Sequence, residues 1–223
     1  CPLYQSKAEI LPSSAIGWWT GKRLPQRHLL NYYESIFTLG GNDNMKIILS
    51  FQPRVFPALC SGLKQFEYRR QFPNGKIEAY IYLSSPVKSI VGKIIFSEKE
   101  KINDLLLDDK ITSEWKTVGR LKLHQEEGAK YVIPIEKIEI LNKFVSLDDA
   151  RKIEPNFFAP QTYCYLRKVP TLDNYLEQLE TKELVSIKEY SRENFLGLLC
   201  NEIYERPDFI DKSEEILGSK VKR

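Results

Sequence analysis

The pattern of apolar and polar residues changes character near residue 44. Before that point, apolar positions in "RHLLNYYESIF" recur at helical spacing and predict an amphipathic helix. After it, "MKIILSF" predicts a buried strand, and "VFPALCSG" predicts a short helix. Turn signals such as "PNG" at 73–75 then separate further strand patterns. These are "QFEYRR", "IEAYIYL", "VKSIVGKIIF", "AKYVIPIEKIEIL" and "TYCYLR". The pattern predicts an α+β fold whose mixed sheet closes into a small β-barrel.

Helices are predicted as insertions into this barrel and as additions at both ends. The segment 98–128 has the pattern of a helical hairpin, with one buried face. That face comprises Leu105, Leu106, Leu107, Ile111 and Trp115. After residue 170 the spacing predicts two further helices. We therefore expect a helical extension or the end of an upstream domain at 1–44, the barrel domain at 45–169, and an acidic helical extension at 170–223.

Composition narrows the class of protein. The chain has 223 residues, of which 42% are hydrophobic, enough for a substantial core. It shows no long apolar run and no signal-peptide pattern, so we expect a cytoplasmic protein without a membrane partner. The four cysteines and two histidines lack metal-ligand spacing, which predicts no metal and no cofactor. We expect Cys60 and Cys164 to be reduced core residues.

Charge is distributed unevenly along the chain. Residues 45–94 contain eight lysines and arginines and two acidic residues, whereas residues 170–217 contain five basic and twelve acidic residues. A basic module followed by an acidic tail favours a polyanionic partner for the first part. Ordinary solvated surface fits the same distribution. The pair Trp18 and Trp19 beside basic residues fits either base stacking or structural anchoring.

The segment "SGLKQFEYRR" at 61–70 contains the main candidate site. Side chains alternate along a strand, so Glu67 and Arg69 share one face, with origins about 7 Å apart. Gly62 permits a tight turn that places Lys64 at the entrance of the strand. One carboxylate beside two cations forms a net-positive site whose remaining donors suit an anion. The same pattern also fits an exposed row of ion pairs, which contributes little stability.

The spacing G-x-K-x-x-E-x-R, occupied by Gly62, Lys64, Glu67 and Arg69, resembles the signature of the ASCH domain family, whose fold is PUA-like. The resemblance covers about residues 45–169, including "MKIILSFQPRVFPALCSG", "AYIYLSSPVKSIVGKIIF" and "APQTYCYL". It implies a PUA-like mixed β-barrel with a cleft beneath the motif, which binds RNA or a nucleotide-like anion and has a regulatory role in some members.

Within that cleft, several residues are candidates for ligand contacts. We expect Lys64, Arg69 and Arg70 to neutralise phosphate, and Glu67 to orient them. Further candidates are the hydroxyls of Ser84 and Ser85 and the amide of Gln161, while Tyr82 or Tyr163 stacks on a base. The Ser-Ser-Pro sequence also fits an ordinary turn, and Gln161 fits a structural role.

The sequence does not decide between an enzyme and a binding module without catalytic activity. As an enzyme the chain would process RNA or a modified nucleoside, with Lys64 and Glu67 as catalytic residues. Some ASCH relatives are amidohydrolases that use a lysine, a threonine and a glutamate, but here Glu67 occupies the threonine position, which argues against that activity. Other relatives are ribonucleases, and Lys64, Glu67 and Arg69 are sufficient for metal-independent acid-base chemistry. A third alternative is a protein partner that binds the C-terminal helices.

Overall fold

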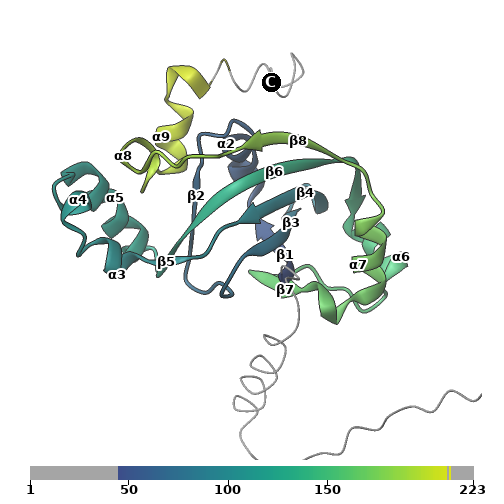
Figure 1. Ribbon diagram of the computed structural model, residues 1–223. Coiled ribbons are helices and arrows are strands. Elements are labelled where there is room, and N and C mark those ends of the chain that lie inside the picture. Colours follow the sequence, from purple (N-terminus) through teal and green to yellow (C-terminus); the bar gives the residue numbers. More distant parts are fainter. Residues whose placement is uncertain (1–44, 210, 212–223) are drawn as a thin grey trace, which may run out of the picture. The chain divides into compact units, whose positions relative to one another are not determined.

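The computed structural model describes residues 45–209 and 211. The predicted N-terminal helix and the tryptophans at 18 and 19 lie outside these residues. The division into three segments stays a prediction. Within the described part, one mixed sheet of eight strands positions the candidate site (Figure 1). The strands are β1 (Met45–Phe51), β2 (Phe66–Arg69), β3 (Ile77–Leu83), β4 (Ser89–Phe96), β5 (Glu100–Lys101), β6 (Tyr131–Ser146), β7 (Tyr163–Tyr165) and β8 (Thr181–Ser186).

The sheet has the order β2-β6-β4-β3-β1-β7, with β5 and β8 also paired to β6. β1 and β3 are parallel and the other pairs are antiparallel. The register between β4 and β6 shifts at two places, and such irregularities bend and twist a strand. Gly92 permits close approach there, because a Cβ atom would lie 2.3 Å from the Glu139 carbonyl oxygen. The sheet therefore curls, as predicted.

The curled sheet is a half-barrel, since its two end strands, β2 and β7, do not pair with each other. A side chain crosses part of this opening. Arg69 at the end of β2 donates a hydrogen bond from Nη2 to the Ser50 carbonyl oxygen of β1 at 3.0 Å. The α+β class and the barrel-like curl predicted from the sequence are confirmed.

Both faces of the sheet are buried, because alternate residues of each strand contribute to different cores. Ile47 and Leu49 pack in the first core with Leu59, whereas Ile48 packs in the second core with Leu172 and Leu176. The helices are η2 (Pro53–Val55), α2 (Phe56–Cys60), α3 (Ile102–Leu105), α4 (Asp109–Thr112), α5 (Trp115–Glu126), α6 (Leu147–Ile153), η3 (Leu166–Lys168), α7 (Pro170–Glu177), α8 (Arg192–Phe195) and α9 (Cys200–Tyr204). In Figure 1, α3–α5 and α6–α7 lie at opposite ends of the sheet.

The helical insertion at 98–128 forms, but its predicted buried face is wrong in part. Leu105 and Ile111 are buried, whereas Leu107 is 81% exposed and Trp115 is 76% exposed. The prediction assumed continuous helices. The segment instead breaks after α3, and the Asp108 side chain accepts from the Lys110 N–H to begin α4. Each break rotates the following residues, so a single helical phase does not apply across the segment.

The prediction of two helices after residue 170 is wrong in part, because a strand lies between α7 and α8. Residues 181–186 form strand β8, which pairs with residues 137–141 of β6. Pairing with an available strand edge satisfies backbone groups, and this tertiary contact overrides local helical spacing. Further on, Gly197 has φ +81° and separates the short helices α8 and α9. No described helix has the length and apolar character that a membrane span requires.

Candidate functional site

Gly62 sets the direction in which the motif leaves α2. Its φ is +71°, and its N–H donates to the Leu59 carbonyl oxygen at 3.0 Å, which closes the turn after the helix. A Cβ atom on Gly62 would lie 3.1 Å from Cγ1 of Val185, a residue of β8. The motif glycine therefore has a structural role in the tight turn predicted from the sequence.

The three charged motif residues form one connected group, which we call the motif cluster. Lys64 Nζ lies 3.2 Å from Glu67 Oε2, and Arg69 Nε lies 2.8 Å from Glu67 Oε1. The side chains of Lys64 and Glu67 are only 7% and 8% exposed. Both contacts are ion pairs that lack the angles of well-formed hydrogen bonds. The alternative of an exposed row of ion pairs is therefore wrong, because the side chains of Lys64 and Glu67 are buried.

Glu67 is held as a carboxylate. Burial by itself raises the pKa of this carboxyl, but the charges of Lys64 and Arg69 lower it further than burial raises it, so the pKa lies below its usual value. The group is therefore ionised at neutral pH and is a poor proton donor there. It is a charge partner for the two cations.

Arg69 is fixed by three contacts that use only part of its donor capacity. Besides the pair with Glu67, it donates to Ser50, and its guanidinium carbon lies 4.9 Å from the centre of the Phe51 ring. A guanidinium carries five N–H donors, so others remain for a ligand. The side chain is 19% exposed, which leaves part of it accessible.

A cleft of about 680 Å³ lies beside the motif cluster. It brings together five of the predicted site residues, namely Glu67, Arg69, Ser84, Ser85 and Gln161. The full lining is Ser50, Phe51, Gln52, Arg54, Val55, Glu67, Tyr68, Arg69, Tyr82, Ser84, Ser85, Lys88, Leu147, Ala159, Pro160 and Gln161. Segments far apart in sequence meet here because β1 pairs with both β3 and β7.

The other predicted site residues do not line the cleft. Lys64 is buried behind Glu67, where its Nζ also donates to the Phe66 carbonyl oxygen at 3.1 Å. Gly62 lies in the turn, and Arg70 is exposed after the end of β2. Lys64 therefore contacts a lining residue, Glu67, without lining the cleft itself.

Two cations of the cleft were not predicted from the sequence. Arg54, in η2, and Lys88, before β4, both line it, and neither is among the ion pairs found in the part of the chain that the structure describes. Lys88 also has φ +47°, an uncommon conformation for a residue with a side chain. Both residues belong to the eight lysines and arginines of residues 45–94. Composition alone, however, does not indicate which of these cations lie in one cleft.

The predicted stacking residues have limited freedom. Tyr82 lines the cleft but is only 3% exposed. Tyr163 packs edge-on against Tyr165, with ring centres 5.6 Å apart, and does not line the cleft. Phe158 is 76% exposed and directly precedes the lining residues 159–161. Phe158 therefore offers an exposed aromatic ring one residue before the lining segment. This residue was not predicted from the sequence.

Other features that could bind a ligand or react are a second hollow, any cluster of metal-binding side chains and the cysteines. A hollow of about 520 Å³ near β5 and α3 contains no motif residue, and its Arg192 is already paired with both carboxylate oxygens of Glu100. Among the described residues, no three His, Cys, Asp or Glu side chains are placed to hold a metal ion. Cys60 is a free, buried thiol, and burial raises its pKa to about 12, as suits a core residue.

Comparison with known proteins identifies a relative. No family model matches the sequence. The chain is 29% identical over 157 residues to an ASCH domain-containing ribonuclease from Zymomonas mobilis subsp. mobilis, and the match covers 65% of this chain and 93% of that protein.

Solved structures give a similar coverage. The crystal structure of ASCH from Zymomonas mobilis has a TM-score of 0.46 and 23% identity, over 62% of this chain and 98% of that one. A mutant of that protein also has a TM-score of 0.46, with 22% identity over 62% of this chain and 99% of that one. Together, the sequence relationship and the motif from Gly62 to Arg69 show that this chain is similar to an ASCH domain-containing protein.

Proposed function

We propose that the chain binds RNA, or a nucleotide-like anion, in the cleft beside the motif cluster. The observation that carries the proposal is the fixed position of Arg69 at this cleft, with donors left over for a ligand. Arg54 and Lys88 add two further cations to the lining, and the acid that accompanies them, Glu67, is neutralised by its own partners. Such a surface attracts phosphate groups.

The remaining polar groups of the cleft suit a nucleotide. The hydroxyls of Ser84 and Ser85 lie in the connection between β3 and β4 and can donate to phosphate or sugar oxygens. Gln161 carries an amide that can pair with the edge of a base. RNA is the favoured class of ligand because the relative from Zymomonas mobilis is named a ribonuclease.

Binding of a labelled single-stranded RNA, followed by fluorescence anisotropy at several salt concentrations, tests this proposal. Replacing Arg69 with alanine removes a charge-assisted contact worth about 1.5–3 kcal/mol, so affinity should fall about 10- to 100-fold. The dependence of log affinity on log salt should also become shallower by about 1.

The adjacent Arg70 provides a matched control for this experiment. Arg70→Ala removes the same charge one residue away, outside the cleft lining, and should change affinity little. Equal effects of the two substitutions would mean that RNA binds elsewhere. Salt-insensitive or absent binding to the unmodified chain would overturn the proposal.

A second candidate function is RNA cleavage, favoured by the named activity of the relative, of which the match covers 93%. Glu67 is the ionised acid among the lining residues of the cleft, so it would accept the proton of a 2′-hydroxyl, and Lys64 would stabilise its negative charge. Labelled RNA without added metal tests this. Cleavage should disappear in Glu67→Gln and persist in Glu139→Gln, at a temperature where both variants are folded. If the unmodified chain leaves the RNA intact, cleavage is refuted and RNA binding is the remaining candidate function.

A further inference from the structure

The motif strand lies at an end of the sheet, which raises the question of what holds it in place. Among the described strands, β2 pairs with β6 alone. Side chains within β2 and directly before it contact residues 190–204, which we call the C-terminal segment. We propose that this segment, together with His124, positions the motif cluster for RNA, although Gly197 and His124 do not line the cleft. The proposal rests on the function proposed above and concerns how the same site is kept in shape.

Three residues form the main attachment. The Gly197 N–H donates to the Tyr68 hydroxyl oxygen at 2.5 Å. The His124 ring stacks on the Tyr68 ring, with centres 3.7 Å apart and planes 6° from parallel. His124 Nε2 in turn lies 3.1 Å from the Gly197 carbonyl oxygen. Strand β2, helix α5 and the C-terminal segment are therefore joined in one closed arrangement around Tyr68.

Tyr68 transmits this attachment to the motif cluster. It stands between Glu67 and Arg69 in β2, so any rotation of its backbone changes the direction of both neighbours. Lys64 Nζ lies 5.4 Å from the centre of the Tyr68 ring, which places the second cation of the cluster against the same side chain. The tyrosine therefore contacts the motif cluster and is held by the C-terminal segment.

The rest of the motif is attached in the same way. The Ser191 N–H donates to Gln65 Oε1 at 3.3 Å, and the Tyr190 ring lies 5.7 Å from that of Phe66. Leu63, directly before Lys64, packs in a small core with residues of the C-terminal segment. That core comprises Ala58, Leu63, Leu198 and Ile203. Contacts thus run along the motif from residue 63 to residue 68.

Gly197 is suited to its place for two separate reasons. Its φ of +81° disfavours any residue with a side chain, and a Cβ atom there would lie 2.7 Å from Arg120 Cβ. Arg120 also anchors the segment, because its Nη2 lies 2.8 Å from Glu202 Oε1. Substitution of Gly197 must therefore displace the segment from α5, and with it the donor to Tyr68.

The proposal is tested with two variants of the full chain. Gly197→Ala displaces the segment, whereas His124→Phe keeps the ring stack and removes only the contact with the Gly197 carbonyl. Each should lower affinity for a labelled single-stranded RNA about tenfold and make its salt dependence shallower by about 1, because Arg69 is no longer fixed. If Gly197→Ala does not fold, His124→Phe still decides the question.

A control separates positioning from general loss of stability. Leu172 is fully buried in a core that contains no residue of the C-terminal segment, so Leu172→Ala should destabilise the fold by about 2–5 kcal/mol. Where that variant is still folded, its RNA affinity and salt dependence should equal those of the unmodified chain. A loss of affinity equal to that of His124→Phe would assign the effect to stability and overturn the proposal.

A measurement without RNA distinguishes this proposal from the proposed function. The NMR signal of the Arg69 Nε–H, assigned by its loss in Arg69→Lys, should shift and exchange faster with water in His124→Phe. Unchanged Arg69 signals and unchanged affinity would overturn the positioning role while leaving RNA binding intact. Changed signals in a chain that binds no RNA would support positioning of the cluster and refute its role in RNA binding.

Discussion

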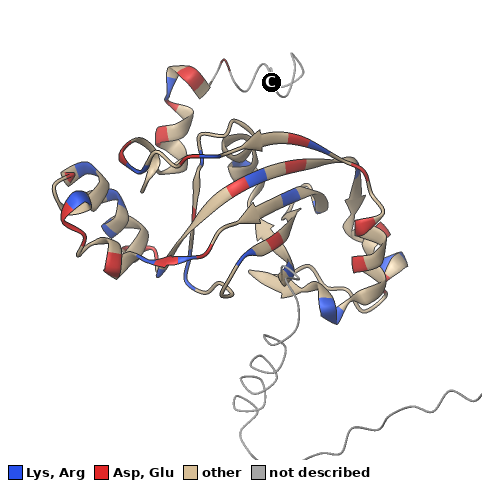
Figure 2. Cartoon of the chain, viewed as in Figure 1, with Lys and Arg blue, Asp and Glu red and all other residues tan. Residues whose placement is uncertain are grey.

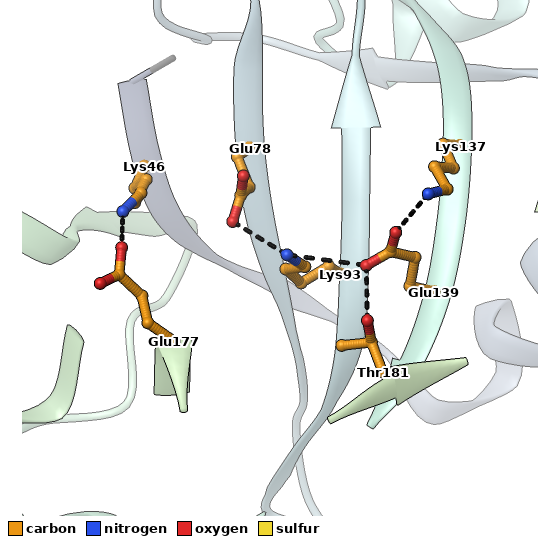
Figure 3. Close-up of polar contacts among 7 residues, drawn as sticks. All are labelled: Lys46, Glu78, Lys93, Lys137, Glu139, Glu177 and Thr181. Carbon is orange, nitrogen blue, oxygen red and sulfur yellow. Dashed lines mark hydrogen bonds and ion pairs between the residues drawn. The ribbon is translucent and has the colours of Figure 1, made fainter. Parts of the chain in front are cut away.

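Two networks of charged side chains use the same residue types in opposite surroundings. The motif cluster is buried beside a cleft. The other network, which we call the sheet-face ladder, lies across β3, β4, β6 and β8, where acidic and basic positions are interspersed (Figure 2). It comprises Glu78, Lys93, Lys137, Glu139, Thr181 and Glu183. Figure 3 shows all of these except Glu183, side by side with the separate pair of Lys46 and Glu177.

The difference lies in how many partners each charge has. In the sheet-face ladder, Lys93 Nζ lies 3.3 Å from Glu78 and 3.6 Å from Glu139, and Lys137 contacts both Glu139 and Glu183. Each lysine therefore has two acids and access to water. In the motif cluster two cations depend on the single carboxylate of Glu67. A charge network that faces a cleft and has no spare partner is the better candidate for function, whatever its size.

The largest expected effect is on stability, and it comes from Glu67→Gln. This substitution leaves Lys64 buried without its counter-ion, and breaking a buried pair in this way costs about 3–5 kcal/mol. Glu139→Gln should cost about 1 kcal/mol or less, because Lys93 keeps Glu78 and Lys137 keeps Glu183. Urea denaturation of both variants measures the difference. If both variants lose the same unfolding free energy, the number of partners per charge does not explain a difference between the two networks.

The next effect is a dependence of stability on pH. The pKa of Glu67 is lowered because Lys64 and Arg69 outweigh the effect of burial, so the carboxylate stabilises the folded state above the unfolded pKa near 4.5. That stabilisation should disappear as pH falls below 4.5 through the lowered folded pKa. The difference in unfolding free energy between the unmodified chain and Glu67→Gln should shrink over the same range. A difference that stays constant down to pH 3 would contradict the assigned charge.

How far the sequence predicts the site depends on the range of the contacts involved. The alternation in "QFEYRR" and the turn at Gly62 are local, and they predicted correctly that Lys64, Glu67 and Arg69 point to a common place. The family resemblance added Ser84, Ser85 and Gln161, which line the same cleft as Arg69. What the sequence did not predict is the depth of the cluster, since the C-terminal segment that covers β2 comes more than 120 residues later.

The fold follows the same rule. The strands β1, β3 and β4 were predicted because their apolar patterns are complete within each segment. Strand β8 was missed because its side chains are mostly exposed and the reason for its conformation is the free edge of β6. The cations Arg54 and Lys88 were missed for a similar reason, because pairing between distant strands determines which loops meet at a cleft.

The smallest expected effect tests the exposed end of the sheet-face ladder. Lys137 is 36% exposed and Glu183 is 52% exposed, so their 3.0 Å contact is screened by water. Lys137→Ala should therefore change the unfolding free energy by about 0.5 kcal/mol or less. A double-mutant cycle with Glu183→Gln should give a coupling near zero at 1 M salt, because ions screen charges beyond about 3 Å there. A coupling above about 1 kcal/mol that survives salt would show that the ladder, like the motif cluster, holds charges out of water, and the contrast between the two networks would no longer stand.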